Sequence, residues 1–443
     1  MKKDGNTSSG RDHELEEYVN FLKFQSISAK HANIRETAEY LRDLLRNLGA
    51  ESSLMETDGH PVVYGNLNLG KERTLLVYNH YDVQPVDPLD EWNHDPFSAE
   101  MEGGRIYARG SSDNKGTLMA RYFGIKRALD ANEIGVNIKF LYEGEEEIGS
   151  PSLEKFIEKN RGILKSDAVI MEGSTLGEGG RPIISLGVKG LLYVEIEDEV
   201  AKSDMHSSYS AIVPNPAWNI ILPLSNLYNG QEVTMPGFYE SVRELTEDEE
   251  KILESYPFDP DSFSRPFGLK YLKHTGKSDL VRWLFTKPTM NIDGFLSGYV
   301  QEGSKTITPR KAMAKLDFRL VPDQDPRKIF ALLENQLRSR GFKGKIKPLG
   351  MEYPVRTSPV SKLAVAMTES ARSVYGKEPI IMINSPGTQP MALFTRNLGI
   401  EEAVSAIGVG DQNSRAHVPD ESIAVENYFL AIEHTKAFLK SFR

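Results

Sequence analysis

The sequence predicts an α/β protein whose larger domain has a mixed, largely parallel sheet with helices on both faces and is interrupted by a smaller α+β domain. Apolar, strand-like runs alternate with segments in which apolar residues recur at helical spacing, a pattern typical of parallel strands joined by helices. That alternation stops near residue 188 and returns after residue 353. We therefore expect the larger domain at residues 1–187 and 354–443, and the inserted domain at residues 188–353.

The larger domain is expected to begin with two helices, at residues 12–22 and 33–48. In the second, Asn33 is the expected N-cap and Gly49 the stop signal. Runs rich in apolar residues then predict strands, with helices wherever the apolar spacing becomes helical. The strands are expected at residues 61–69, 73–80, 137–142, 167–171 and 183–186, and the helices between them at residues 115–131 and 152–159.

The inserted domain is expected to start with a long strand at residues 188–199, in which polar residues alternate with apolar ones. A helix near residues 218–228 follows it. No element can be assigned to residues 236–288, which are rich in Tyr, Phe, Pro and charge and show little periodicity. Strand-like alternation then returns on either side of a predicted helix, and these elements are expected at residues 306–317, 326–340 and 345–349.

Composition describes an ordinary globular protein, with 39% hydrophobic and 26% charged residues. The 443 residues exceed the roughly 250 to 300 at which a single core stops growing, which again indicates at least two domains. The formal net charge of -10 and the lack of a dense basic run argue against nucleic acid as a partner. The first twenty residues lack the apolar core of a signal peptide, and no apolar stretch is long enough to cross a membrane, so we expect a cytoplasmic protein. Because the chain has no cysteine, any bound metal must be held by His, Asp and Glu.

The strand at residues 73–80 ends in His80-Tyr81-Asp82, at the edge where open α/β sheets bind their ligands. His80 could coordinate a metal, and Asp82 could accept the other ring N–H and so fix the tautomer. A His-x-Asp pair alone is a weak indication, since most such pairs are surface or satisfied residues.

Asp113 stands in a glycine-bounded turn, Gly110 to Gly116, that opens the helix at residues 115–131. Taken alone, Asp113 is best explained as an N-cap, because helix N-termini favour anions. A carboxylate that bridges two cations also needs such a rigid turn. Both explanations stay open on the sequence pattern alone.

Acidic residues and a histidine follow three further segments. Four carboxylates lie within the five residues Glu143 to Glu147, directly after an apolar strand, where they repel one another unless a cation neutralises them. Glu172 follows the strand at residues 167–171, and His417 lies in a loop rich in Gly, Asn and Ser. A solvated acidic loop and an ordinary loop histidine would explain each alone. Together the five segments supply His, Asp, Glu, Glu and His to one rim of the sheet, which suits two zinc ions that share a carboxylate.

Three motifs resemble those of a known family. They are His-Tyr-Asp-Val-Gln-Pro at residues 80–85, Arg-Gly-Ser-Ser-Asp-Asn-Lys-Gly at residues 109–116 and Glu-Glu-Ile-Gly-Ser at residues 146–150. In this order and spacing they resemble the dizinc peptidase family of carnosine and cytosolic non-specific dipeptidases, glutamate carboxypeptidase, acetylornithine deacetylase and succinyl-diaminopimelate desuccinylase. The resemblance covers nearly the whole chain. It implies a catalytic domain with an inserted lid and dimerisation domain, and hence a homodimer.

The resemblance also implies roles for individual residues. It implies two Zn²⁺ ions per subunit, with Mn²⁺ or Co²⁺ as possible substitutes, and a hydroxide bridging the ions that attacks the amide carbonyl. Glu146 is then the general base, Asp82 orients His80, and Glu145 takes no part. The implied metal ligands are His80, Asp113 (which bridges the ions), Glu147, Glu172 and His417.

In the inserted domain the resemblance is closest to the dipeptidase-like subgroup. It implies that His206 donates to the oxyanion in the partner subunit's active site. It further implies that Arg319 binds the terminal carboxylate of the substrate, with hydrogen bonds from Thr306 and Gly387. Without the family, Arg319 is as well explained by an ordinary salt bridge. Burial is the alternative for His206, but the polar neighbours Asp204, Ser207 and Ser208 favour an exposed, hydrogen-bonded imidazole.

The function predicted in this way is zinc-dependent hydrolysis of short peptides, as a dipeptidase or a carboxypeptidase. An N-acyl amino acid deacylase with the same metal centre stays open as an alternative. A homologue that has lost catalysis and only binds metal is a further alternative, against which the intact Glu146 and the complete ligand set argue. The loop Ser385 to Thr388 stands where dipeptidases commonly carry Glu-Gly, which leaves the preferred peptide open.

Overall fold

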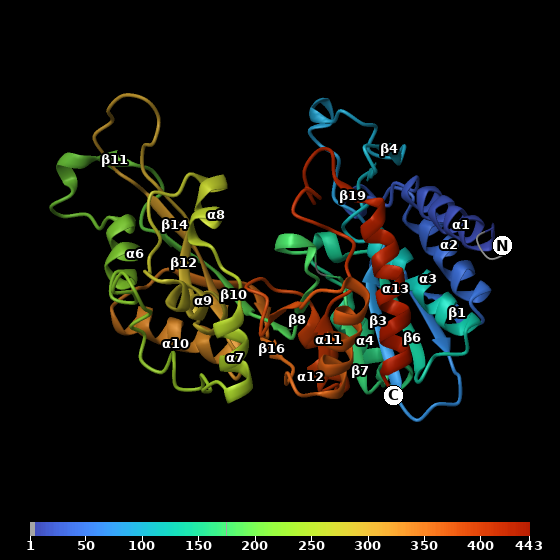
Figure 1. Cartoon of the computed structure of the whole chain (residues 1–443). Coiled ribbons are helices and arrows are strands. Elements are labelled where there is room, and N and C mark those ends of the chain that lie inside the picture. Colours follow the sequence, from blue (N-terminus) through green and yellow to red (C-terminus); the bar gives the residue numbers. More distant parts are fainter. Residues whose placement is uncertain (1–4, 174) are drawn as a thin grey trace. The chain divides into compact units, whose positions relative to one another are not determined.

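The computed structural model describes residues 5–173 and 175–443, with side chains from residue 10 onward. The chain divides into two compact units. Figure 1 shows the chain coloured by residue number, from blue at the N-terminus to red at the C-terminus. Unit 1 comprises Met1–Gly187, Thr357–Ile383 and Leu393–Arg443, and unit 2 comprises Val188–Arg356 and Asn384–Ala392. The segment at residues 384–392 thus groups with unit 2, because Lys189 N donates to the carbonyl oxygens of Ser385 and Gly387. The domain limits expected from the sequence leave this segment in the larger domain.

Unit 1 contains an eight-stranded sheet in the order β1-β2-β6-β3-β7-β18-β8-β17. Its central strands β6, β3, β7 and β18 are parallel neighbours, and β17 is parallel to β8. The pairs β1–β2, β2–β6 and β18–β8 are antiparallel. This confirms the predicted mixed, largely parallel sheet. The strands are β1 (Glu51–Met55), β2 (Val62–Leu67), β3 (Thr74–His80), β6 (Asn137–Glu143), β7 (Ala168–Met171), β8 (Ile183–Ser185), β17 (Ile380–Met382) and β18 (Glu402–Ser405).

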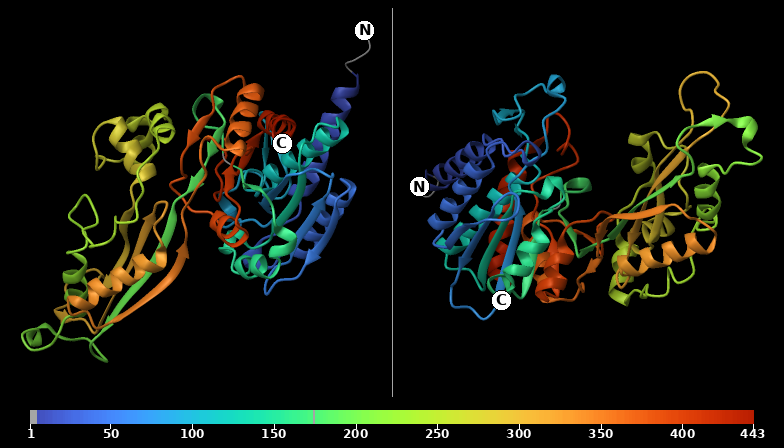
Figure 2. Two further views of the ribbon diagram at one scale, coloured as in Figure 1. Left: turned by 90° about the horizontal axis from the view of Figure 1, so that it is seen from below. Right: turned by 180° about the vertical axis from the view of Figure 1, so that it is seen from behind.

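Helices cover both faces of this sheet, as the two views of Figure 2 show. In α2 the buried residues Ile34, Leu41 and Leu45 fall on one stripe, which is why this helix packs on β1 and β2. Asn33 occupies the N-cap position of α2, but its backbone is left-handed (φ 50°) and its side chain makes no cap hydrogen bond. None of the described helices is long and apolar enough to span a membrane. The helices are α1 (Gly5–Leu22), α2 (Ile34–Asn47), α3 (Lys115–Asp130), α4 (Leu153–Lys159), α5 (Arg161–Leu164), α11 (Lys362–Tyr375), α12 (Met391–Leu398) and α13 (Val425–Ser441).

Unit 2 is built on a four-stranded antiparallel sheet in the order β12-β14-β10-β15. Alternate residues such as Leu192, Val194 and Leu316 enter a core that the helices α6 and α10 cover. The predicted α+β character of this part is confirmed. The elements are β10 (Gly190–Glu199), α6 (Pro216–Leu224), β12 (Thr289–Ser297), β14 (Lys311–Leu320), α10 (Pro326–Ser339) and β15 (Lys345–Glu352), with the short strands β9 (Gly187–Val188), β11 (Met205–His206), β13 (Ile307–Thr308) and β16 (Val355–Arg356).

The segment at residues 236–288, to which the sequence assigned no element, contains three α-helices. They are α7 (Glu247–Ser255), α8 (Pro260–Ser264) and α9 (Lys277–Thr286). α7 begins with a capping box, in which Thr246 and Glu249 exchange side-chain and backbone hydrogen bonds. These helices are short, so helical periodicity has little length over which to show itself.

The sheet of unit 1 brings the carboxyl ends of its four central strands to one edge. β3 ends at His80, and His80 lies opposite Glu143 at the end of β6. β7 and β18 end beside them at Met171 and Ser405. Side chains that follow these strands must therefore meet at this edge, which is where open α/β sheets place their ligands.

Candidate metal centre

Two histidines and four carboxylates come together at this edge of the sheet in unit 1. They arrive on five separate segments, so no single helix or strand carries the site. The six residues are His80 at the end of β3, Asp113 in the turn before α3, Glu146 and Glu147 in a 3₁₀ turn after β6, Glu172 directly after β7, and His417 in the loop that follows β18.

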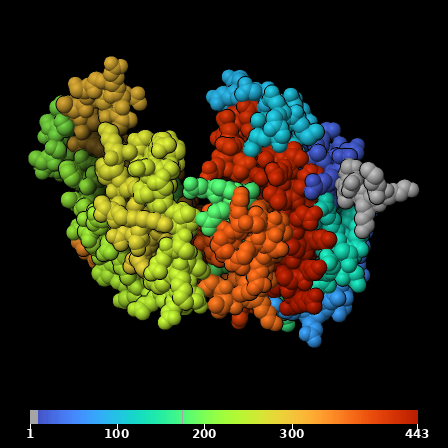
Figure 3. Space-filling model, in the orientation of Figure 1, coloured from blue at the N-terminus to red at the C-terminus, as the bar shows by residue number. Residues whose placement is uncertain are grey.

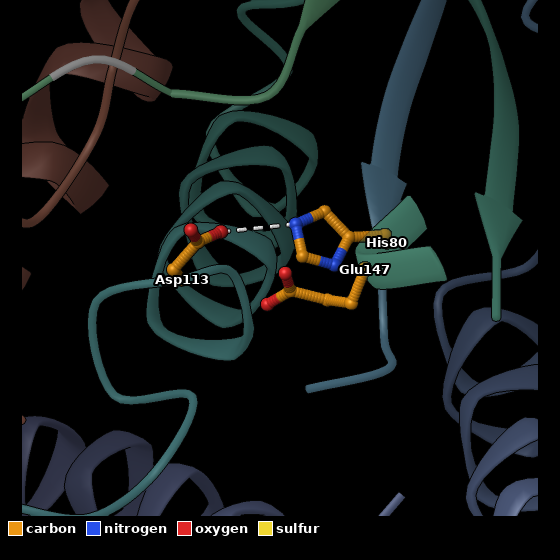
Figure 4. A group of neighbouring side chains, drawn as sticks. All are labelled: His80, Asp113 and Glu147. Atoms are coloured by element: carbon orange, nitrogen blue, oxygen red, sulfur yellow. Dashed lines mark hydrogen bonds and ion pairs between the residues drawn. The ribbon is translucent and has the colours of Figure 1, made fainter. Parts of the chain in front are cut away.

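The distances divide five of these side chains into two half-sites that share Asp113. His80 Nε2 lies 3.0 Å from Asp113 Oδ1 and 3.1 Å from Glu172 Oε2. His417 Nε2 lies 3.1 Å from Asp113 Oδ2 and 3.2 Å from Glu147 Oε2. Figure 4 shows Asp113, His80 and Glu147 converging on the same space. Each half-site thus offers one imidazole nitrogen and two carboxylate oxygens, and Asp113 presents one oxygen to each.

The polar atoms of the cluster suit a cation. Glu147 Oε1 and Glu172 Oε2 are buried and accept no hydrogen bond, although Glu172 Oε2 is close to His80. Buried polar atoms normally have a partner, so these oxygens are orphaned without a positive ion. Imidazole and carboxylate are also the ligands that Zn²⁺ and Mn²⁺ accept.

The ionisation of the cluster leads to the same conclusion. Burial, with repulsion from Glu172, raises the pKa of Glu146 to about 9. Hydrogen bonds with Asp113 and Glu147 raise the pKa of His417 to about 10. Without metal ions, Glu146 and His417 therefore hold protons at neutral pH, and these protons reduce the negative charge of the cluster. Metal ions bound there would release those protons and reverse the shifts.

Asp82 contacts both the His80 ring and the turn that carries Glu146 and Glu147. Its carbonyl oxygen is 3.1 Å from His80 Nδ1 and its carboxylate Oδ1 is 3.4 Å from the same nitrogen. The fully buried carboxylate also accepts hydrogen bonds from the backbone N–H groups of Glu146, at 3.2 Å, and Glu147, at 3.0 Å. Asp82 therefore couples the orientation of the imidazole to the position of the glutamate turn.

The three consecutive glutamates differ clearly in their surroundings. Glu145 is buried away from the centre, where its Oε1 accepts the backbone N–H of His60 at 3.0 Å. Glu146 groups with His80 and Glu172, whereas Glu147 groups with His80 and Asp113. Glu146 and Glu147 thus both lie at the centre and Glu145 does not, and the register in which Glu146 is the base and Glu147 the ligand stays a prediction.

The N-cap explanation of Asp113 fails in the structure. The residue at the N-cap position of α3 is Asn114, and it makes no side-chain cap hydrogen bond. The Asp113 carboxylate instead lies between the two histidine rings.

The other predicted site residues belong to unit 2 and form two groups. His206 is exposed, and its Nδ1 accepts the backbone N–H of Ser208 at 3.1 Å. Thr306 lies close to His206, because β11 pairs with β13 directly after Thr306. The carbonyl oxygen of Thr306 accepts a hydrogen bond from the backbone N–H of Ser207. Arg319 and Gly387 form the second group, in which Arg319 Nη1 donates to Thr388 Oγ1 at 3.0 Å. The buried position considered for His206 is not what the structure shows.

The sequence pattern gives no functional indication for three buried charged residues around the centre. Arg121 donates to the carbonyl oxygens of Tyr78, Met171 and Ala406, which ties the ends of β3, β7 and β18 together. Burial lowers its pKa to about 9. Arg109 and Glu421 form a second buried set. The only signal in the sequence was that Arg109 opens the motif at residues 109–116.

Comparisons relate the chain to known proteins over almost its full length. The model of "Peptidase family M20/M25/M40" matches residues 76–441, which include every residue of the metal centre. The Beta-Ala-His dipeptidase of Homo sapiens is 28% identical over 425 residues, or 90% of this chain and 82% of that protein. The Cys-Gly metallodipeptidase DUG1 of Candida albicans is 27% identical over 447 residues, or 94% and 90% of the two chains. Among solved structures, the M20 family metallo-carboxypeptidase Sso-CP2 from Sulfolobus solfataricus has a TM-score of 0.91 and 53% identity, covering 97% of this chain and 99% of that one.

Proposed function

The chain belongs to peptidase family M20/M25/M40 and is a metallopeptidase, and on this premise we propose that it hydrolyses short peptides with two Zn²⁺ ions per subunit. The family resemblance of the sequence motifs is thereby confirmed. The observation that carries the proposal is the pair of half-sites, in which Asp113 offers one oxygen to His80 and Glu172 and the other to His417 and Glu147. Mn²⁺ or Co²⁺ would fit the same ligands, because oxygen-rich sites accept several divalent ions.

The five ligands would hold the ions, and Glu146 would carry the proton. Two bound Zn²⁺ ions would lower the pKa of water and polarise the substrate carbonyl. Glu146 would take a proton from the attacking water and deliver it to the leaving amine. Its position supports this role, because Asp82 accepts its backbone N–H and its side chain lies beside His80 and Glu172, next to the first half-site.

The kind of substrate is inferred from the named relatives and from Arg319. Relatives of this chain are a dipeptidase, a metallodipeptidase and a metallo-carboxypeptidase, whose substrates end in a free carboxylate. Arg319 is half-buried and keeps guanidinium donors beyond the one that binds Thr388, although Asp317 lies 3.3 Å from its Nε. We expect this guanidinium to bind the terminal carboxylate bidentately, with Thr306 and Gly387 adding neutral hydrogen bonds.

A peptide panel with one variant tests both the activity and this clamp. The wild type should hydrolyse free dipeptides or tripeptides well, and should hydrolyse their C-terminally amidated forms and N-acetyl or N-succinyl amino acids poorly. Arg319→Ala should raise KM strongly for free peptides and leave the poor rate on amidated peptides unchanged. Lys315→Ala is a matched control, since Lys315 lies on the same face of β14 and is similarly exposed.

Two results would contradict these expectations. Equal rates on free and amidated peptides would remove the carboxylate clamp. Faster turnover of N-acyl amino acids than of any peptide would replace the peptidase with a deacylase, and no turnover of either class by the metal-loaded protein would leave only metal binding.

The subunit arrangement is a second part of the proposal. His206 is exposed at the end of β11. Its Nδ1 accepts the backbone N–H of Ser208, so the neutral ring carries its proton on Nε2, which could donate a hydrogen bond. We expect unit 2 to form a homodimer in which His206 stabilises the oxyanion in the partner's active site. The cytoplasmic location stays a prediction.

Mixing two inactive variants tests whether His206 acts across the dimer. His206→Ala should cost about 10² to 10³ in kcat, as loss of an oxyanion donor does, with normal metal content. After exchange of subunits with Glu146→Gln, half the dimers are mixed and each has one complete site, so activity should return toward about a quarter of wild type. No recovery, despite exchange shown by mass spectrometry, would mean that His206 serves its own chain or has no catalytic role.

A further inference from the structure

A buried ion pair lies beside the metal centre without belonging to it. Arg109 is 1% exposed and Glu421 is fully buried, and Arg109 Nη1 lies 2.9 Å from Glu421 Oε2. A buried charge is costly unless it is paired and hydrogen-bonded, so such a pair needs a reason to be kept.

The Glu421 carboxylate is saturated with N–H donors. Oε2 accepts from Arg109 and from the backbone N–H of Gly110, at 3.1 Å. Oε1 accepts from the backbone N–H groups of Ser112, at 2.8 Å, and Asp113, at 3.0 Å. With two donors on each oxygen, Glu421 is an anchor for the Asp113 turn, and it has no oxygen left over for a cation.

Arg109 extends the anchor to two other segments. Its Nη2 donates to Pro85 O at 3.1 Å, three residues after Asp82, and its Nη1 is 3.4 Å from Val418 O, next to His417. The ion pair thus joins the segment after β3, the Asp113 turn and the His417 loop.

The loop that carries His417 depends on such anchors. His417 has φ 67° and Asp420 φ 60°, a left-handed conformation that is unfavourable for a non-glycine residue and persists only when its surroundings hold it. Asp420 accepts from Asn93 Nδ2 at 2.6 Å, and the light-blue segment around Asn93 lies against the red C-terminal loop in Figure 3. Beyond Glu421, β19 (Ser422–Ala424) pairs with β5 (Arg105–Tyr107), just before Arg109.

The two half-sites depend unequally on this anchor. In the first, His80 and Glu172 are held by the ends of β3 and β7, and only Asp113 depends on Glu421. In the second, both Asp113 and His417 lie on segments that Glu421 joins, and only Glu147 is held independently, by Asp82. Loss of the anchor should therefore weaken the second half-site more.

We infer that Glu421, with Arg109, is a positioning residue that sets the separation of Asp113 and His417 and so determines the affinity for the ion in the Asp113–Glu147–His417 half-site. This inference rests on the proposed two-ion centre. The carboxylate of Glu421 acts through the backbone of the Asp113 turn and does not touch the ion.

The test measures metal binding, not activity. Zn²⁺ is titrated into metal-stripped wild type and Glu421→Gln by calorimetry, and Co²⁺ absorption provides a second readout. His80→Ala and His417→Ala assign the two binding steps to the two half-sites. Glu421→Gln keeps the size of the side chain but turns an NH₂ group toward N–H donors. The affinity of the His417 step should fall 10- to 100-fold, the range found when groups behind a metal ligand are lost, and the His80 step should change much less.

Two further variants separate positioning from general destabilisation. Glu249→Gln is the matched control, because Glu249 is an equally buried carboxylate paired with Arg356 and Arg243, but in unit 2. It should lower the melting temperature and leave both metal steps unchanged. Arg109→Lys keeps the charge but cannot donate to Pro85, Val418 and Glu421 together, so it should show the same selective loss if Glu421→Gln does not fold.

The results distinguish a failure of the positioning role from a failure of the two-ion centre. Unchanged metal affinities with a lowered melting temperature, or equal losses in both steps, would overturn the positioning role while leaving the two-ion centre in place. A wild type that binds fewer than two ions would overturn the proposed centre itself.

Discussion

Chelation of the metal should abolish peptide hydrolysis completely, and Zn²⁺, Mn²⁺ or Co²⁺ should restore it. The half-sites consist of acidic oxygens and imidazole nitrogens around a shared carboxylate, and the chain has no cysteine that could act as a thiol nucleophile. The measurement is turnover of a dipeptide against metal content per subunit. Activity should rise steeply only as both half-sites fill.

The stripped protein should keep its fold, because the centre lies at the edge of the unit 1 sheet and the protonated Glu146 and His417 relieve part of the repulsion. Circular dichroism before and after chelation provides the control. Full turnover at a metal content near zero would contradict a metal-dependent reaction.

Glu146→Gln should lower kcat by about 10² to 10⁴, the range expected for loss of a general base. This corresponds to about 2.7 to 5.4 kcal/mol of activation free energy. The amide has nearly the shape of the carboxylate but cannot accept a proton from water. Since Glu146 is not among the five proposed ligands, metal content should stay near that of the wild type. Steady-state kinetics with metal analysis of the same sample measures both.

Glu145→Gln is the matched control, one residue away in the same turn. Glu145 Oε1 accepts the backbone N–H of His60, and a glutamine oxygen can accept it equally well. Its kcat should therefore stay close to wild type. If Glu145→Gln were the crippling change and Glu146→Gln the mild one, the assignment of the base would be wrong.

The elements of the sheet could be predicted where their residues are buried. β3, β6 and β7 are rich in apolar residues because they are largely buried, and their predicted limits differ from the structure by one residue or so. β1 was missed, since it lies at the edge of the sheet and has no buried residue to produce a pattern. The helices α7 to α9 could not be predicted either, because they are short and their few apolar positions give no clear period.

The chemistry of the site was visible in the sequence because it depends on residue type and local spacing. His80 and Asp82 stand two apart at the end of an apolar strand, and Glu146 and Glu147 follow another, so the sequence by itself determined which side chains could reach one edge of a parallel sheet.

Only the tertiary structure decided how those side chains divide and what holds them. That Asp113 offers one oxygen to His80 and the other to His417, more than 300 residues later in the chain, depends on the strand order β6-β3-β7-β18, which no local pattern encodes. Glu421 is equally hidden in the sequence, because a carboxylate that binds three backbone N–H groups of a distant turn and the Arg109 guanidinium looks like any exposed glutamate until the turn is folded against it. Local spacing determines what a segment can present, whereas contacts between distant segments determine where it is held.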